Sequence, residues 1–174
     1  TLSSGSLSPS FASGTLAYTA SVANSVSSLI VTPTTNDANA TATVNGASAT
    51  TPVTLAVGSN TVTVQVTAQD GTLQNYTVAV TRAAASSDAT LSALALSSSS
   101  LSPSFASGTL AYTASVVHSV NSLIVTPTTN DANATATVNG ASAATPVTLA
   151  VGSNTVTVQV TAQDGTTTQS YTVT

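Results

Sequence analysis

The chain has 174 residues, of which 41% are hydrophobic and only 3% are charged, and it contains no cysteine. The net charge of −4, with a single lysine or arginine, provides no basic patch and excludes nucleic-acid binding as an expected function. No apolar run approaches the roughly 18 residues that a membrane span needs, so we expect a soluble segment with any export signal outside it.

The composition also bears on location and order. With so few charges, solubility must come from the hydroxyls and amides of Ser, Thr, Asn and Gln. Such an acidic, Ser- and Thr-rich chain favours an extracellular or cell-surface location. Val, Leu and Ala alternate with polar residues, which indicates packed β-sheets rather than disorder.

Short strands separated by turn signals follow one another along the first half of the chain. The first predicted strand ends at Leu2–Leu7, and the second copy shows this strand more fully as Ala89–Leu96. A proline after Leu7 interrupts the strand. In the third strand Leu29 and Val31 should face inward and Ile30 outward. This third strand is predicted at Ser28–Thr34. The other predicted strands are Leu16–Val22, Ala40–Val44, Val53–Val57, Thr61–Thr67 and Tyr76–Thr81.

The stretch Gly58–Gly71 organises the pattern, because it recurs unchanged at Gly152–Gly165. Its valines alternate with threonine and glutamine, the period of a strand with one dry face and one wet face. Asp70-Gly71 closes the stretch with a dipeptide suited to the positive φ angles of a tight hairpin turn. Asn45-Gly46 is a turn signal of the same kind.

Internal repetition dominates the sequence. Leu2–Thr72 recurs 94 positions later as Leu96–Thr166. After this block the second copy has one extra residue, which we expect in a hairpin loop because insertions are tolerated there. The copies differ in the block only at Gly5/Ser99, Ala23/Val117, Asn24/His118, Ser27/Asn121 and Thr50/Ala144.

The repeats predict two all-β domains, residues 1–84 and 85–174, each a β-sandwich of about seven strands. Because Thr1 aligns with Ala95 and Thr174 with Ala79, we expect an incomplete first strand in the first domain and an incomplete last strand in the second. The short, small-residue linker Arg82–Asp88 favours an end-to-end junction over a floppy tether.

Two equivalent turns carry the oxygen ligands that calcium prefers, and their weak calcium candidates are Asp37, Asn39, Asp131 and Asn133. Calcium needs about six to eight oxygens with substantial negative charge. Each copy offers few carboxylates, such as Asp37 and Asp70, with Asp88 in the linker. Ordinary turn hydrogen bonding is therefore the favoured interpretation, and we expect no required metal or cofactor.

The residues give little support to an enzyme. His118 replaces Asn24 of the other copy at a loop position, which argues against a required ligand or base. No second histidine, cysteine or carboxylate pair is available to orient it. We therefore expect no catalytic residues.

Surface modification and surface binding remain open. Acceptor triplets for N-linked glycans begin at Asn39, Asn75 and Asn133. Outward threonines at positions 61, 63 and 67 form a row that is typical of a wet sheet face, with an ordered lattice such as ice as a minor alternative ligand.

Several ordered motifs carry a family resemblance. They are Leu-Ser-Pro-Ser-Phe followed by Tyr18 or Tyr112, Val31-Thr-Pro-Thr, Thr43-Val-Asn-Gly46, Gly58-Ser-Asn-Thr-Val62 and Thr67-Ala-Gln-Asp-Gly71. They resemble the bacterial cadherin-like β-sandwich domain. The resemblance implies two tandem Ig/cadherin-like antiparallel β-sandwich domains of a large secreted or surface-anchored protein. It implies no enzymatic residues and does not by itself imply calcium.

We therefore expect a non-enzymatic structural repeat that acts as a rod-like spacer in an extracellular stalk, adhesin or filament. Its partners would be neighbouring repeats of the same chain, with self-assembly into a filament as a further hypothesis. The alternative is a carbohydrate- or protein-binding adhesion module. Sugar-binding faces usually expose aromatic rings, whereas we expect Phe11, Tyr18 and Tyr76 in the core.

Overall fold

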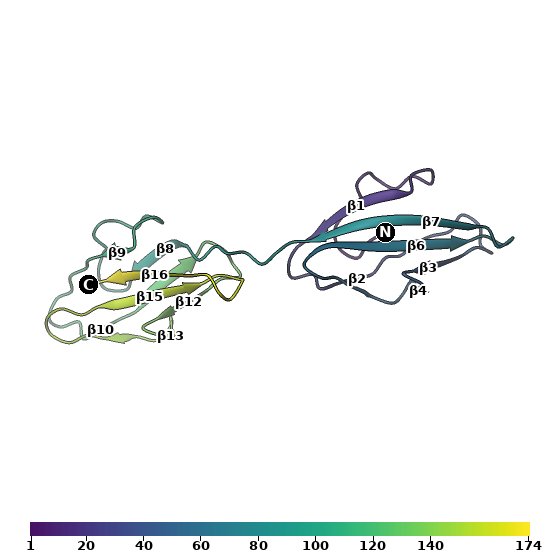
Figure 1. The fold of residues 1–174 in the computed structure, drawn as a ribbon. Helices are drawn as coiled ribbons and strands as arrows, with labels where there is room; N and C mark the ends of the chain where they lie inside the picture. Colours follow the sequence, from purple (N-terminus) through teal and green to yellow (C-terminus); the bar gives the residue numbers. More distant parts are fainter. The chain divides into compact units, whose positions relative to one another are not determined.

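The computed structural model describes residues 1–174, which form strands and loops without a helix (Figure 1). No helix that could cross a membrane is thus present among them. The chain divides into two compact units, Thr1–Ala84 and Ala85–Thr174. Both units are all-β, which confirms the predicted fold class.

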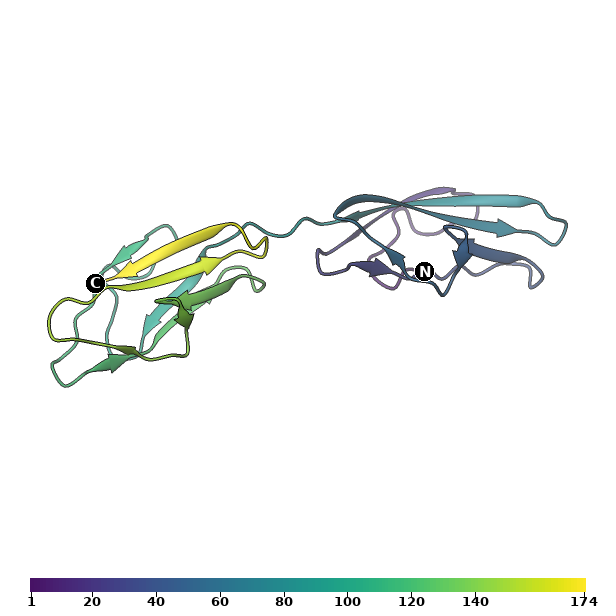
Figure 2. The same ribbon diagram turned by 60° about the horizontal axis from the view of Figure 1, so that its bottom comes forward.

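In the first unit a five-stranded sheet has the order β1-β7-β6-β3-β4. Figures 1 and 2 show the long β6–β7 hairpin of this sheet. The short antiparallel pair β2–β5 lies outside it. The strands are β1 (Ala17–Val22), β2 (Ser28–Leu29), β3 (Thr41–Val44), β4 (Ala47–Ser48), β5 (Val53–Thr54), β6 (Gly58–Thr67) and β7 (Leu73–Arg82).

The second unit repeats this arrangement with one addition. Its five-stranded sheet has the order β13-β12-β15-β16-β9, and two antiparallel pairs, β8–β11 and β10–β14, complete it. The strands are β8 (Leu91–Leu96), β9 (Ala111–Tyr112), β10 (Ser122–Leu123), β11 (Val125–Thr129), β12 (Thr135–Val138), β13 (Ala141–Ser142), β14 (Val147–Thr148), β15 (Val156–Thr161) and β16 (Thr168–Val173). The pair β8–β11 is the addition, because the equivalent residues of the first unit form only an isolated bridge between Leu2 and Val31.

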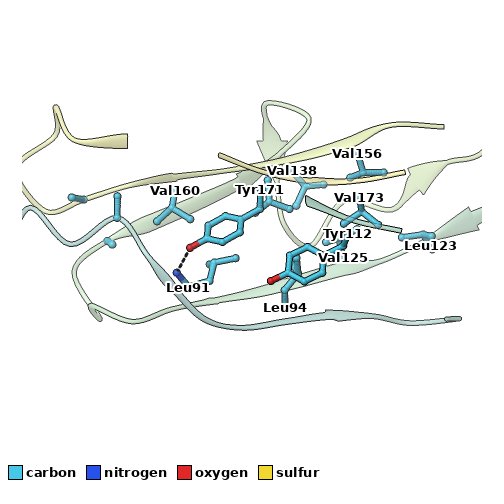
Figure 3. Close-up of a cluster of buried hydrophobic side chains, with 14 residues drawn as sticks. Leu91, Leu94, Tyr112, Leu123, Val125, Val138, Val156, Val160, Tyr171 and Val173 are labelled. Atoms are coloured by element: carbon cyan, nitrogen blue, oxygen red, sulfur yellow. Dashed lines mark hydrogen bonds between the residues drawn. The ribbon is translucent and has the colours of Figure 1, made fainter. Parts of the chain in front are cut away.

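Each unit has its own hydrophobic core, built by alternation along its strands. In β1 every second residue is buried, and Leu29 and Val31 are buried while Ile30 is 38% exposed, as predicted. Figure 3 shows the core of the second unit, where side chains from β8, β11, β15 and β16 meet. Burial of these Val, Leu and Tyr side chains is the main favourable term in the folding of each unit.

The turn between β3 and β4 confirms the prediction for Asn45-Gly46. Both residues have positive φ angles, 50° and 77°. The Oδ1 atom of Asn45 also accepts a hydrogen bond from the backbone N of Thr63 at 2.8 Å. The side chain thereby ties the turn to β6.

The turn between β6 and β7 differs from the prediction, because only Gly71 has a positive φ angle, 87°, and Asp70 does not. The N of Gly71 donates to the O of Ala68 at 3.0 Å, and the N of Ala68 donates to the O of Thr72 at 2.9 Å. This is a turn closed by a left-handed glycine rather than a two-residue turn. The extra residue of the second copy lies in the equivalent loop, between β15 and β16, as predicted.

Two further details differ from the sequence analysis. Most ladders are antiparallel, but β1 pairs in parallel with β7, and β9 pairs in parallel with β16. Val57, expected to extend the fifth strand, lies in the loop after β5 with 54% of its surface exposed. Side-chain alternation identifies the face of a strand but carries no information on its partner or its last residue.

Candidate functional site

The predicted calcium candidates form equivalent turns, one pair in each unit. The Oδ1 atom of Asp37 accepts hydrogen bonds from the backbone N of Asn39 at 2.9 Å and from its Nδ2 at 3.2 Å. In the second unit Asp131 makes the same bonds with Asn133, at 2.8 and 3.1 Å. These are side-chain-to-backbone bonds of an Asx turn.

Asp88 is part of the second unit, although the sequence analysis placed it in the linker. Its Oδ1 atom accepts hydrogen bonds from the N and the Oγ1 of Thr90, at 2.9 and 2.6 Å. Its Oδ2 atom accepts one from Nδ2 of Asn130 at 2.7 Å. The Thr90 hydroxyl and Asn130 lower the pKa of Asp88 below its usual 3.8. Asp88 thus fastens the start of β8, through a partner 42 residues away that no local pattern reveals.

We expect that a chelator such as EDTA leaves the melting temperature of the chain unchanged. The few carboxylates of each unit are too sparse for a strong calcium site, and the Asp37 and Asp131 oxygens already accept hydrogen bonds within their turns. The measurement is a thermal melt with and without the chelator. A drop of more than about 5 °C, equivalent to roughly 1 kcal/mol in a domain of this size, would contradict the expectation.

The most strongly perturbed carboxylate is Asp164, at the β15–β16 turn. Its Oδ2 atom accepts a hydrogen bond from Oγ1 of Thr167 at 2.6 Å, and its Oδ1 atom accepts from the backbone N atoms of Thr166 and Thr167, each at 2.8 Å. These bonds, the Thr167 hydroxyl foremost, lower the pKa of Asp164 to about 2. The equivalent Asp70 accepts from the N of Thr72, which lowers its pKa as well.

We expect the second unit to lose stability as the pH falls from about 4 to about 2. A folded-state pKa below the unfolded value stabilises the fold above the unfolded pKa, and this stabilisation is lost as the pH falls through the folded pKa. Asp164→Asn should reduce the dependence of second-unit stability on pH in this range. Asp70→Asn should do the same for the first unit. Urea midpoints from unit-specific NMR signals at several pH values measure the effect. A second-unit profile that Asp164→Asn leaves unaltered would refute this assignment.

The remaining candidate residues lie on the surface and are not brought together. His118 is exposed in a loop of the second unit. The predicted glycan acceptors Asn39, Asn75 and Asn133 are exposed as well. Of the threonine row only Thr61 is exposed, whereas Thr63 and Thr67 are half-buried. None of these residues lines either of the two pockets described below.

An apolar groove opens in the first unit, at residues that the sequence analysis placed in the core. Phe11 is 62% exposed, which corrects the prediction that it is buried. Its ring stacks on Tyr18 at 5.8 Å and lies 5.9 Å from the ring of Tyr76. These rings line a groove of about 490 Å³, together with Leu2, Leu7, Val31, Pro33, Ala40, Val64, Val66 and Val78.

The equivalent region of the second unit is closed. Phe105, which corresponds to Phe11, is half-buried, and Tyr171, which corresponds to Tyr76, is fully buried. The residues that cover it are Ala89, Leu91 and Leu94, at or near β8. An incomplete first strand was expected in the first domain, but local sequence does not show which side chains such a strand covers, so the exposure of Phe11 was missed.

A second depression, of about 400 Å³, lies in the second unit near its last strand. Leu96, Val116, Leu123 and Val173 are among its lining residues. In the first unit the end of β7 occupies the matching place, where Val80 is fully buried and Nη1 of Arg82 donates to the O of Leu55 at 2.9 Å.

The comparisons with known proteins agree with this architecture. A model of the cadherin-like beta sandwich domain matches the chain twice, at residues 2–83 and 91–174. A search of curated proteins gives no match. The matched ranges cover most of both units, and the motifs identified in the sequence fall within them. The chain therefore belongs to the cadherin-like β-sandwich domain family, of which it contains two tandem copies.

Proposed function

We propose that the chain is a non-enzymatic structural repeat of an extracellular stalk, adhesin or filament, in which it acts as a rod-like spacer. Cadherin-like β-sandwich domains are typically extracellular adhesion or structural modules, a non-catalytic fold. We propose the spacer role and the surface location of this chain on the basis of these typical properties of the family. Self-assembly into a filament is part of the same proposal.

The observation that carries the proposal is the presence of two near-identical domains with independent cores. A spacer needs repeated units that fold by themselves and carry surfaces with few charges, and both features are encoded in the repeat. The buried side chains of each core are hydrophobic, with no buried charge to neutralise.

The connection between the units also supports a spacer. The N of Ala83 donates to the O of Val22 in the first unit at 3.0 Å. The N of Ser86 donates to Oε1 of Gln163 in the second unit at 2.9 Å. Only Ala84 and Ala85 lie between these anchored residues, so the free linker is shorter than the sequence suggests.

Small-angle X-ray scattering tests the rod. A compact particle of 174 residues would have a radius of gyration of about 16 Å. Two sandwiches placed end to end should exceed about 20 Å, with a distance distribution that has a long tail. A radius near the compact value would rule out the spacer mechanism.

One observation favours a second candidate, a carbohydrate- or protein-binding adhesion module. The exposed Phe11 ring supplies the aromatic surface that sugar-binding faces use, which the sequence analysis had assigned to the core. A glycan array with the chain and with its Phe11→Ala variant tests this function. Glycan binding that is lost in the variant would support this function. Absence of glycan binding by the parent chain would exclude a carbohydrate ligand.

The exposed acceptor asparagines are proposed sites of glycan modification, which would suit an extracellular surface. Intact-mass measurement of the chain from its natural source would detect added hexose units, and a mass equal to that of the bare polypeptide would exclude this proposal.

A further inference from the structure

We propose that the parallel ladder between β1 and β7 of the first unit bears load and resists tension applied along the chain. We call this ladder the clamp, and it consists of the six residue pairs from Ala17↔Thr77 to Val22↔Arg82. The inference deepens the proposed spacer role and rests on it, because a stalk or filament transmits tension through each of its repeats. It adds a mechanical function and names the bonds that carry the load.

The directions of the two strands decide how tension acts on the clamp. β1 and β7 lie side by side and run parallel (Figure 1). Whatever precedes Leu16, tension reaches β1 at its N-terminal end, and it leaves β7 at Arg82, its C-terminal end. In a parallel pair these two points lie at opposite ends of the ladder. The load therefore acts along the strands and falls on all six pairs together, instead of opening them one at a time.

β7 has two ladders, and the clamp is the shorter one. On its other side β7 pairs with β6 through ten residue pairs, from Gly58↔Arg82 to Thr67↔Leu73. The longer ladder keeps β7 attached to the rest of the sheet when the chain is pulled. Sliding therefore begins between β1 and β7, and the clamp sets the force at which the unit unfolds.

The core covers the inner face of the clamp. The inward side chains of β1, which are Tyr18, Ala20 and Val22, are 4%, 4% and 7% exposed. The inward side chains of β7, which are Val78 and Val80, are 4% and 0% exposed. Ladder bonds under load cannot be replaced by bonds to water on this side, so breaking them costs more than it would in an open hairpin.

Arg82 fastens the end of the clamp from which the tension leaves. Its Nε donates to the O of Asn24 at 2.8 Å, and its Nη1 donates to the O of Leu55 at 2.9 Å. Beside it the N of Ala83 donates to the O of Val22 at 3.0 Å. Arg82 is the only lysine or arginine of the chain. Its guanidinium ties two loops to the end of β7 through charge-assisted hydrogen bonds, which are stronger than neutral ones.

The second unit has the same strand directions. There β9 pairs in parallel with β16, with Ala111 opposite Thr172 and Tyr112 opposite Val173. The parallel arrangement is thus a feature of the repeat and not of one copy.

Single-molecule force spectroscopy in two pulling geometries tests the clamp. The chain contains no cysteine, so a pair of introduced cysteines gives unique handles on the full chain. Thr1→Cys with Ala84→Cys loads the first unit end to end. Ala17→Cys with Asn75→Cys loads it laterally, across one end of the ladder, and all four positions are exposed. We expect an end-to-end unfolding force at least about twofold above the lateral one, because forced unfolding is governed by the unfolding barrier and six pairs must break together.

Two variants separate load bearing from stability. Arg82→Met keeps an unbranched apolar side chain and removes both guanidinium bonds, so it should speed end-to-end unfolding at a given force by about tenfold. It should not alter the lateral force, because opening then begins at Ala17. Asn45→Ala is the matched control, since it removes the bond from the N of Thr63 in the β3–β4 turn, at the opposite edge of the sheet from β1. It should lower the urea midpoint of the first unit, as Arg82→Met does, but leave the end-to-end force unchanged.

Equal unfolding forces in the two geometries would overturn the proposal. An equal loss of end-to-end force in Asn45→Ala and Arg82→Met would overturn it as well, because both variants would then report on stability alone. If Arg82→Met does not fold, the comparison of geometries still decides, since it leaves Arg82 in place. Neither measurement depends on particle shape, so this test and the scattering test of the spacer can fail separately.

Discussion

Replacement of Leu91 by alanine is expected to lower the stability of the second unit by about 2–5 kcal/mol. Leu91 lies at the start of β8 and is fully buried in the core, between the two layers of the sandwich. Truncation removes its apolar surface and leaves a cavity that the surrounding strands fill only in part. The bond from its backbone N to Tyr171 remains available, so the effect reports on packing.

Urea unfolding followed by NMR signals of each unit measures this change. The second-unit midpoint should fall, while signals of the first unit should keep theirs. Ala95→Ser is the matched control, because Ala95 lies on the exposed face of the same strand and should alter stability by less than about 0.5 kcal/mol. An unchanged second-unit midpoint in the Leu91 variant would mean that β8 does not pack into the core in solution.

Gly71→Val and Gly165→Val are each expected to destabilise their own unit by about 1–3 kcal/mol. Both glycines hold positive φ angles, 87° and 71°, which a β-branched residue adopts only with strain. A Cβ at either position would meet no atom within 4 Å, so the cost comes from the backbone and not from a collision. Each variant should therefore lower the urea midpoint of one unit only.

Two controls separate backbone strain from crowding. Gly71→Asn should be better tolerated than Gly71→Val, since asparagine accepts the left-handed conformation. Gly14→Val should have little effect, because Gly14 has no positive φ angle and an added Cβ has open space around it. Equal losses for valine and asparagine at position 71 would show that the turn does not require the left-handed conformation.

Much of the architecture was predictable because its signals are local. The alternation of Val62 and Val64 with threonine identifies a strand and its buried face. The Asn45-Gly46 pair identifies a turn, because few residues accept positive φ angles. The extra residue of the second copy had to fall in a loop, since an insertion in a paired strand would move its core residues to the wrong face. The family motifs added the sandwich, which the family match confirms.

The candidate site was less predictable because it depends on strand partners far apart in the sequence. Asp88 accepts a hydrogen bond from Asn130, and the Tyr171 hydroxyl accepts one from the backbone N of Leu91. The parallel pairing of β1 with β7 joins residues about 60 positions apart, and no local pattern distinguishes it from antiparallel pairing.

The sequence by itself determined two all-β repeats, the faces of their strands, and the positions of their turns, because these follow from side-chain period and backbone preference. Only the tertiary structure showed which side chains the first strand of the second unit covers. Phe11 and Phe105 lie in the same local sequence, yet Phe11 is 62% exposed and Phe105 is half-buried. The difference arises because burial is a property of what packs against a residue, and β8 packs only in the second unit.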